Sequence, residues 1–200
     1  MRGREFERYA RHSLLPRLPA GFTARRSLVF KVTAGNVLHG ITTDSSAFTT
    51  DFYVWVFVQP LYVPSEYIVL DFGDRVGGGA RRWSRDEMQG GSLTEAVVSA
   101  APALFARIGE PAGLARAAEQ TERNSRHAEV AGRSWFAVGD NARAVRALRV
   151  AAGTTDPRDW AQELGRRCAA FADLIERDPS AAEEEHHRVI SSTRAALRLT

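Results

Sequence analysis

The chain has 200 residues, of which 44% are hydrophobic and 26% are charged, a composition typical of one globular domain or two small ones. This composition argues against a disordered chain, and no apolar run reaches the roughly 20 residues that cross a bilayer. The formal net charge of +3 is a small excess and does not indicate a strongly basic surface. We therefore expect a cytoplasmic protein that does not associate with membranes.

The chain begins with a predicted amphipathic helix. Within residues 4–15, Phe6, Tyr9 and Leu14 recur at helical spacing, and Pro16 ends the pattern. Several arginines lie in this basic first segment, with few acids between them.

Four runs that favour β-structure follow, at residues 27–33, 37–43, 50–59 and 66–73. The first two flank a short Gly/Asn loop, as in a hairpin. The third is apolar at both odd and even positions, which predicts a central strand covered on both faces. Because no helical pattern separates the runs, they predict a four-stranded antiparallel meander.

Beyond a Gly- and Arg-rich connector, the second half reads as helical. Ser92 and Glu95 match a capping box at the start of the first of these helices. Helices are expected at residues 93–108, 112–123, 126–138, 140–151, 157–177 and 180–198. The sequence thus predicts an α+β fold, with a helix and meander domain at 1–91 and a helical domain at 92–200 packed on the sheet.

One stretch of the helical half, residues 127–157, carries small, aromatic and proline residues at spaced positions: Gly132, Trp135, Gly139, Ala144, Leu148, Ala151 and Pro157. This stretch resembles a tetratricopeptide-type helical hairpin over about one repeat. The resemblance implies two antiparallel helices that approach closely at small residues. The whole layout is also similar to uncharacterised bacterial α+β families, some of which are found among immunity or accessory proteins.

Few residues indicate catalysis. Cys168 is the only cysteine, so internal disulfides are excluded, and we expect a buried thiol. Asp71 and Asp74 flank the end of the fourth predicted strand, beside a glycine loop at 77–79, where paired acids could hold a cation or transfer protons. His39 lies on a predicted strand and could act as a base only with a partner. No cofactor is indicated.

Glu183 and His187 are four residues apart on a predicted helix and could share a metal ion. No third ligand can be named, so a solvated charged face is the simpler interpretation. The sequence predicts no metal centre.

Surface aromatic and basic residues indicate binding functions. Tyr62, Tyr67 and Trp83 are candidate anchors for a protein interface. Around Trp83, the candidate cations are Arg81, Arg82 and Arg85. These arginines also leave nucleic-acid binding open.

We expect a non-enzymatic protein-interaction module, of the immunity or accessory-subunit type. A small-ligand or metal-dependent enzyme with its site near Asp71 and Asp74 is the first alternative. A nucleic-acid-binding accessory protein is the second. Self-association through a sheet edge stays open.

Overall fold

The computed structural model describes residues 3–45, 51–121 and 124–199. The chain forms two compact units, the first made of Met1–Gln59 with Val69–Gly109 and the second of Pro60–Ile68 with Glu110–Thr200. The sequence predicted one boundary near residue 91, whereas each of these units is made of two separate segments of the chain. The sheet unit keeps the first long helix of the second half, and a short segment after the central strand belongs to the helical unit.

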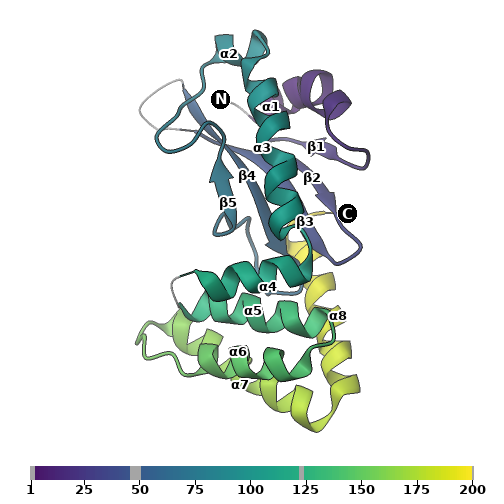
Figure 1. The fold of residues 1–200 in the computed structure, drawn as a ribbon, viewed down its shortest axis with the longest axis vertical. Coiled ribbons are helices and arrows are strands. Elements are labelled where there is room, and N and C mark those ends of the chain that lie inside the picture. Colours follow the sequence, from purple (N-terminus) through teal and green to yellow (C-terminus); the bar gives the residue numbers. More distant parts are fainter. Residues whose placement is uncertain (1–2, 46–50, 122–123, 200) are drawn as a thin grey trace. The chain divides into compact units, whose positions relative to one another are not determined.

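The sheet unit contains a five-stranded antiparallel sheet whose strands follow one another in chain order (Figure 1). The predicted α+β class and the meander are therefore confirmed. The strands are β1 (Thr23–Arg25), β2 (Leu28–Val32), β3 (Val37–Ser45), β4 (Phe52–Pro60) and β5 (Gly73–Arg75). The helices of this unit are α1 (Gly3–Tyr9), which continues through a π-helical turn η1 (Ala10–Leu14) and a 3-10 turn η2 (Leu15–Arg17), α2 (Arg85–Gln89) and α3 (Ser92–Ile108).

The two edge strands differ from the prediction. β1 was not predicted, because its three residues are too short to show a period. The fourth predicted strand, at 66–73, is wrong for most of its length, since β5 begins only at Gly73 and pairs Trp55 with Arg75 and Phe57 with Gly73. Gly73 suits this pairing, because a Cβ there would lie 2.7 Å from the Phe57 Cβ.

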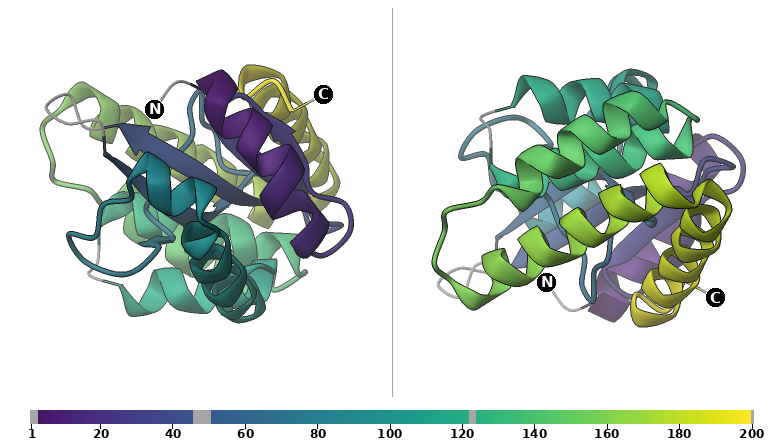
Figure 2. Two further views of the ribbon diagram at one scale, coloured as in Figure 1. Left: turned by 90° about the horizontal axis from the view of Figure 1, so that it is seen from above. Right: turned by 90° about the horizontal axis from the view of Figure 1, so that it is seen from below.

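α1 and α3 cover one face of the sheet (Figures 1 and 2). The apolar stripe of α3 is almost completely buried at Leu93, Val97, Ala101 and Leu104. The Tyr9 hydroxyl and Thr94 Oγ1 are 2.7 Å apart, in a buried hydrogen bond that joins the two helices. Because this apolar stripe is buried, α3 is part of the sheet unit.

The capping box predicted at Ser92 and Glu95 is wrong. Gly91 is the N-cap of α3, with a φ of +86°, and it supplies no side-chain cap. Glu95 instead pairs with Arg17. The capping box is one helix earlier, where Ser84 and Glu87 cap α2 reciprocally.

The central strand β4 is covered unequally on its two faces. Phe52, Val54, Val56 and Val58 on the α3 side are at most 1% exposed. On the other side Phe57 is buried, but Tyr53 and Trp55 are only partly covered. The expectation of full burial on both faces is therefore wrong for these two rings, which arginine side chains cover instead of an apolar layer.

The helical unit contains the other five predicted helices, each displaced by a few residues at most from its expected bounds. They are α4 (Pro111–Gln120), α5 (Ser125–Ala137), α6 (Asn141–Ala152), α7 (Asp159–Arg177) and α8 (Pro179–Ala196). α4 to α7 stack in chain order, and α8 runs across the ends of these helices (Figures 1 and 2).

α5 and α6 form a helical hairpin that turns at Gly139, whose φ is +81°. A Cβ on Gly132 would lie 2.6 Å from Leu148 Cγ and 3.0 Å from the Ala144 carbonyl oxygen. The two helices therefore approach closely at Gly132, where only a hydrogen fits.

The segment after β4 is anchored inside the helical unit. Tyr62 is completely buried, and its hydroxyl is 2.9 Å from Ser134 Oγ on α5. Its carbonyl oxygen accepts a hydrogen bond from Arg133 at 3.4 Å. Thr193 on α8 donates to the Val63 carbonyl at 3.5 Å. These contacts explain why a short segment of the first half is part of the second unit.

Candidate interaction site

The three aromatic residues predicted as interface anchors differ in exposure. Tyr67 is 69% exposed, as an anchor requires. Tyr62 and Trp83 are 0% and 4% exposed, so neither ring is available at the surface. Trp83 pairs with Phe52 beside β4 and donates its indole N–H to the Val76 carbonyl at 3.0 Å. Both rings are core residues, because each polar group has an internal partner.

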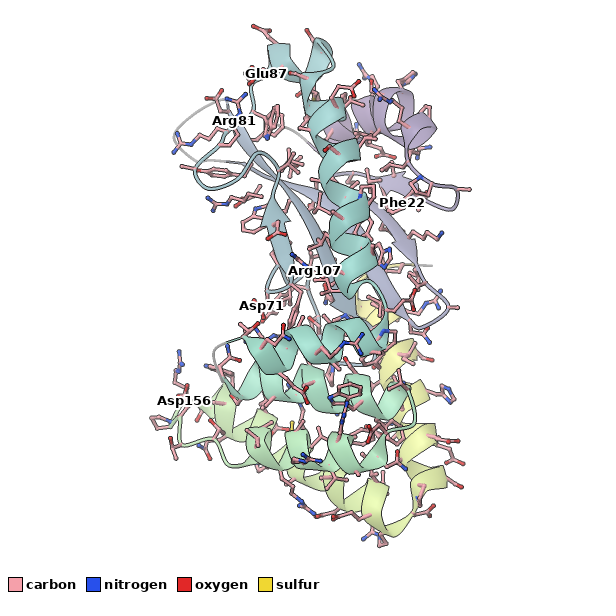
Figure 3. The ribbon with its side chains drawn as sticks, viewed as in Figure 1. Phe22, Asp71, Arg81, Glu87, Arg107 and Asp156 are labelled. Atoms are coloured by element: carbon pink, nitrogen blue, oxygen red, sulfur yellow. The ribbon has the colours of Figure 1, made fainter. Side chains whose placement is uncertain are left out.

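The three arginines around Trp83 already have partners within the sheet unit. Arg81 pairs with Glu87 and lies over the Trp83 ring (Figure 3). Arg82 donates to the Tyr53 hydroxyl at 3.0 Å. Arg85 pairs with Glu5 at 2.7 Å. Through these contacts, the three arginines attach α2 and the segment before it to the rest of the sheet unit.

The same type of contact covers the partly exposed rings of β4. The Arg75 guanidinium lies 4.1 Å from the centroid of the Tyr53 ring and 4.9 Å from that of Trp55. Arg82 lies on Tyr53 as well, at 5.6 Å. Because arginines stack on these rings, the rings are not free platforms for nucleic-acid bases.

Two residues predicted for an enzymatic site, His39 and Asp74, each contact the C-terminal end of α3. His39 Nε2 is 2.8 Å from the Gly109 carbonyl oxygen, and the ring stacks on Phe105. Asp74 is exposed and pairs with Arg107 at 3.3 Å. Asp71 is exposed too (Figure 3). His39 is therefore placed as a structural contact between β3 and the end of α3.

The glycine loop at 77–79 serves as a turn. Gly77, Gly78 and Gly79 have φ values of +86°, +77° and +44°, a region that favours glycine. Arg75 donates to the Gly79 carbonyl at 3.2 Å and closes the loop. Across residues 3–45, 51–121 and 124–199, no group of three acidic, histidine or cysteine side chains could hold a metal ion.

His186 and Cys168 are interior residues of the helical unit. His186 is 8% exposed and packs between the rings of Tyr62 and Phe136, each 5.3 Å away between centroids. Burial lowers the pKa of His186 to about 4, and the nearby positive charges of Arg133 and His187 act in the same direction. Cys168 is completely buried, and burial raises the pKa of its thiol to about 12. This agrees with the expected buried thiol.

A buried ion cluster in the helical unit was missed from the sequence. The Glu129 carboxylate, which is 0% exposed, accepts from Arg167 at 2.6 and 2.8 Å and from Arg133 at 3.3 Å. Arg133 also lies over the Phe171 ring. The sequence signal is weak, because Glu129 and Arg133 are four residues apart on α5 and match an exposed ion pair on one helix face. Packing against α7, which brings Arg167 to Glu129, buries the pair.

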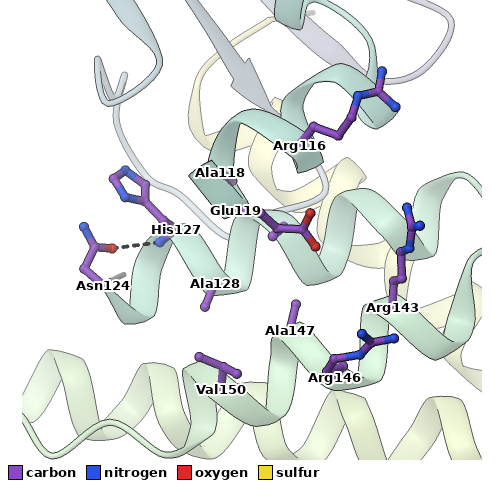
Figure 4. Close-up of a pocket in the computed structure, with 11 residues that line it drawn as sticks. Arg116, Ala118, Glu119, Asn124, His127, Ala128, Arg143, Arg146, Ala147 and Val150 are labelled. Carbon is purple, nitrogen blue, oxygen red and sulfur yellow. Dashed lines mark hydrogen bonds between the residues drawn. The ribbon is translucent and has the colours of Figure 1, made fainter. Parts of the chain in front are cut away.

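A concave surface of the helical unit is a groove of about 560 Å³ between α4, α5 and α6 (Figure 4). Each of α5 and α6 presents residues at helical spacing to this groove. On α6 these are Arg143, Arg146, Ala147 and Val150, and on α5 they are His127, Ala128 and Ala131, preceded by the N-cap Asn124. α4 contributes Arg116, Ala118 and Glu119.

The groove has an apolar floor and a cationic end. Alanine side chains and the 55% exposed Val150 form the apolar part. Figure 4 shows Arg116, Arg143 and Arg146 toward one side of the close-up, with Val150 and His127 toward the other. None of these lining residues was predicted as a site, because residues from three helices meet only after the helices have packed.

No helix in the described ranges is long and apolar enough to cross a membrane. Comparisons with family models, with curated proteins and with solved structures found no match for this chain. The groove is therefore interpreted from its own geometry and charge.

Proposed function

We propose that this protein is a non-enzymatic interaction module whose helical unit holds a segment of a partner protein in the α4–α6 groove. It acts as a scaffold or blocking subunit in the bacterial cytoplasm. The observation that carries the proposal is the groove itself, a concave surface with a floor of small side chains.

The openness of this surface favours a polypeptide over a small molecule. Small-molecule sites bury about 70–90% of their ligand. Here Arg116, Glu119 and Val150 are exposed, so they line an open groove rather than an enclosed cavity. A floor of alanines lets a partner backbone approach closely. The resemblance of residues 127–157 to a tetratricopeptide hairpin supports the same function by analogy, since such hairpins present grooves to partner segments.

Site-specific photo-crosslinking in the native host tests this function. A photoreactive amino acid replaces Ala147 in the groove, and in a matched control it replaces Glu184, which is exposed on α8. We expect a covalent adduct with one protein from position 147 and none from position 184. A second variant, Val150→Trp, should fill the apolar end and reduce that adduct.

Two results would contradict the proposal. One is the absence of any adduct at Ala147 in a folded protein. The other is the same set of adducts at both positions, which would indicate random encounters.

A further inference from the structure

The arginines at the end of the groove exceed its acids. Among the residues that the structure describes, three arginines line it, at 116, 143 and 146, against the single carboxylate of Glu119. That carboxylate accepts a hydrogen bond from the Trp135 indole N–H at 2.8 Å, and this bond holds the Glu119 side chain of α4 against α5. The groove is therefore cationic.

Arg143 differs from the other two arginines. Its guanidinium lies 4.6 Å from the centroid of the Trp135 ring and pairs with Asp140 at 3.5 Å. Within the described part of the chain, the side chains of Arg116 and Arg146 have no ion-pair or hydrogen-bond partner. Both are exposed, so their full hydrogen-bonding capacity is open to a ligand.

The groove does not suit a nucleic acid. Single-stranded nucleic acids need aromatic faces on which bases stack. Among the described residues of the lining, the only ring is that of His127, which is 9% exposed. The Trp135 ring behind the groove is covered by Arg143. An anionic polypeptide is the ligand that matches arginines beside an alanine floor.

We infer that the groove binds an acidic segment of the partner protein, with carboxylates on Arg116 and Arg146 and a small apolar side chain against Ala147 and Val150. This inference rests on the proposed function and adds the chemistry of the partner. A second copy of this chain is the competing occupant, because Glu183 and Glu184 are exposed acids on α8.

Selection from a displayed library of random twelve-residue peptides tests the inference without assuming a sequence. The targets are the wild type, R116E/R146E, A147W and the control R177E/R194E. The control makes the same change in net charge within the helical unit but outside the groove. Circular dichroism melting confirms that each target is folded.

We expect peptides selected on the wild type and on R177E/R194E to be rich in Asp and Glu, and those selected on R116E/R146E to be rich in Lys and Arg. The acidic peptides should bind R116E/R146E at least about tenfold more weakly than the wild type. A147W should select no peptides.

The contrary outcomes separate the two ideas. If the selected peptides are neutral and bind the wild type but not A147W, the inference of an acidic segment is overturned and the proposed function stands. Peptides that bind A147W as tightly as the wild type would overturn both the inference and the proposed function. A wild-type dimer in light scattering that R116E/R146E converts to a monomer would assign the groove to a second copy and overturn the inference.

Discussion

The buried carboxylate of Glu129 is where a single substitution should test the packing of the helical unit most directly. Glu129→Gln keeps the side-chain shape and removes the negative charge that faces Arg133 and Arg167. Arg133 is only 2% exposed and cannot regain water, whereas Arg167 is 28% exposed and can. Removing one partner of a buried ion pair costs about 3–5 kcal/mol. We expect the lower end, about 3 kcal/mol, because Arg167 becomes hydrated.

A graded series makes this magnitude testable. Arg167→Gln removes the two shorter hydrogen bonds to Glu129 but leaves Arg133 in place, so we expect a loss of about 1.5–3 kcal/mol. The control is Arg177→Gln, an exposed change on α7 that should alter the free energy of unfolding by no more than about 0.5 kcal/mol. Urea unfolding at neutral pH, followed by far-ultraviolet circular dichroism, reports mainly on the helices.

The losses of unfolding free energy in the three variants are compared with one another. If Glu129→Gln costs less than about 1 kcal/mol, or no more than Arg177→Gln, the cluster is hydrated and the electrostatic reasoning is refuted. A change in the urea dependence of the unfolding free energy would point to an altered unfolded state instead.

Three further tests address other contacts of the helical unit. Burial and neighbouring positive charge lower the pKa of His186 to about 4, against about 6.5 when unfolded, so the unfolded chain binds the proton first as the pH falls. The free energy of unfolding should therefore be highest above about pH 6.5 and fall by up to about 3 kcal/mol toward pH 4. His186→Phe should remove this loss, which is measured by comparing urea midpoints at the two pH values. Gly132→Ala should cost about 1–3 kcal/mol because its Cβ meets Leu148, whereas Gly153→Ala, with nothing nearer than 3.6 Å, should be nearly neutral in thermal melts. Tyr62→Phe should cost about 1–3 kcal/mol by leaving Ser134 unpaired, and adding Ser134→Ala should recover part of this loss; additive losses in the double mutant would contradict the contact.

The helical half of the chain was largely predictable because helix signals are local. Breaks at Gly139, Gly153 and Pro157, together with the apolar period between them, predicted α5, α6 and α7 to within a few residues. Gly132 was predicted at a close approach of two helices, and Leu148 does lie against it.

The errors in the sheet unit have a common cause. Strands of three residues, such as β1 and β5, show no measurable period, and their existence depends on hydrogen bonds from a neighbouring strand. The capping box at Ser84 was overlooked because α2 is only five residues long. Trp83 was predicted at the surface because its connector is polar, yet pairing with Phe52 buries it.

The sequence by itself determined the α+β class and the order of the elements, because propensity, periodicity and chain breaks act over a few neighbouring residues. Only the tertiary structure decided which side chains meet. The buried Glu129 cluster joins α5 to α7, Tyr62 anchors a segment of the first half in the helical unit, and Arg116 lies with Arg146 in one groove. These contacts join residues about 30 to 70 positions apart, and helix packing, which depends on the shape of whole faces, brings them together.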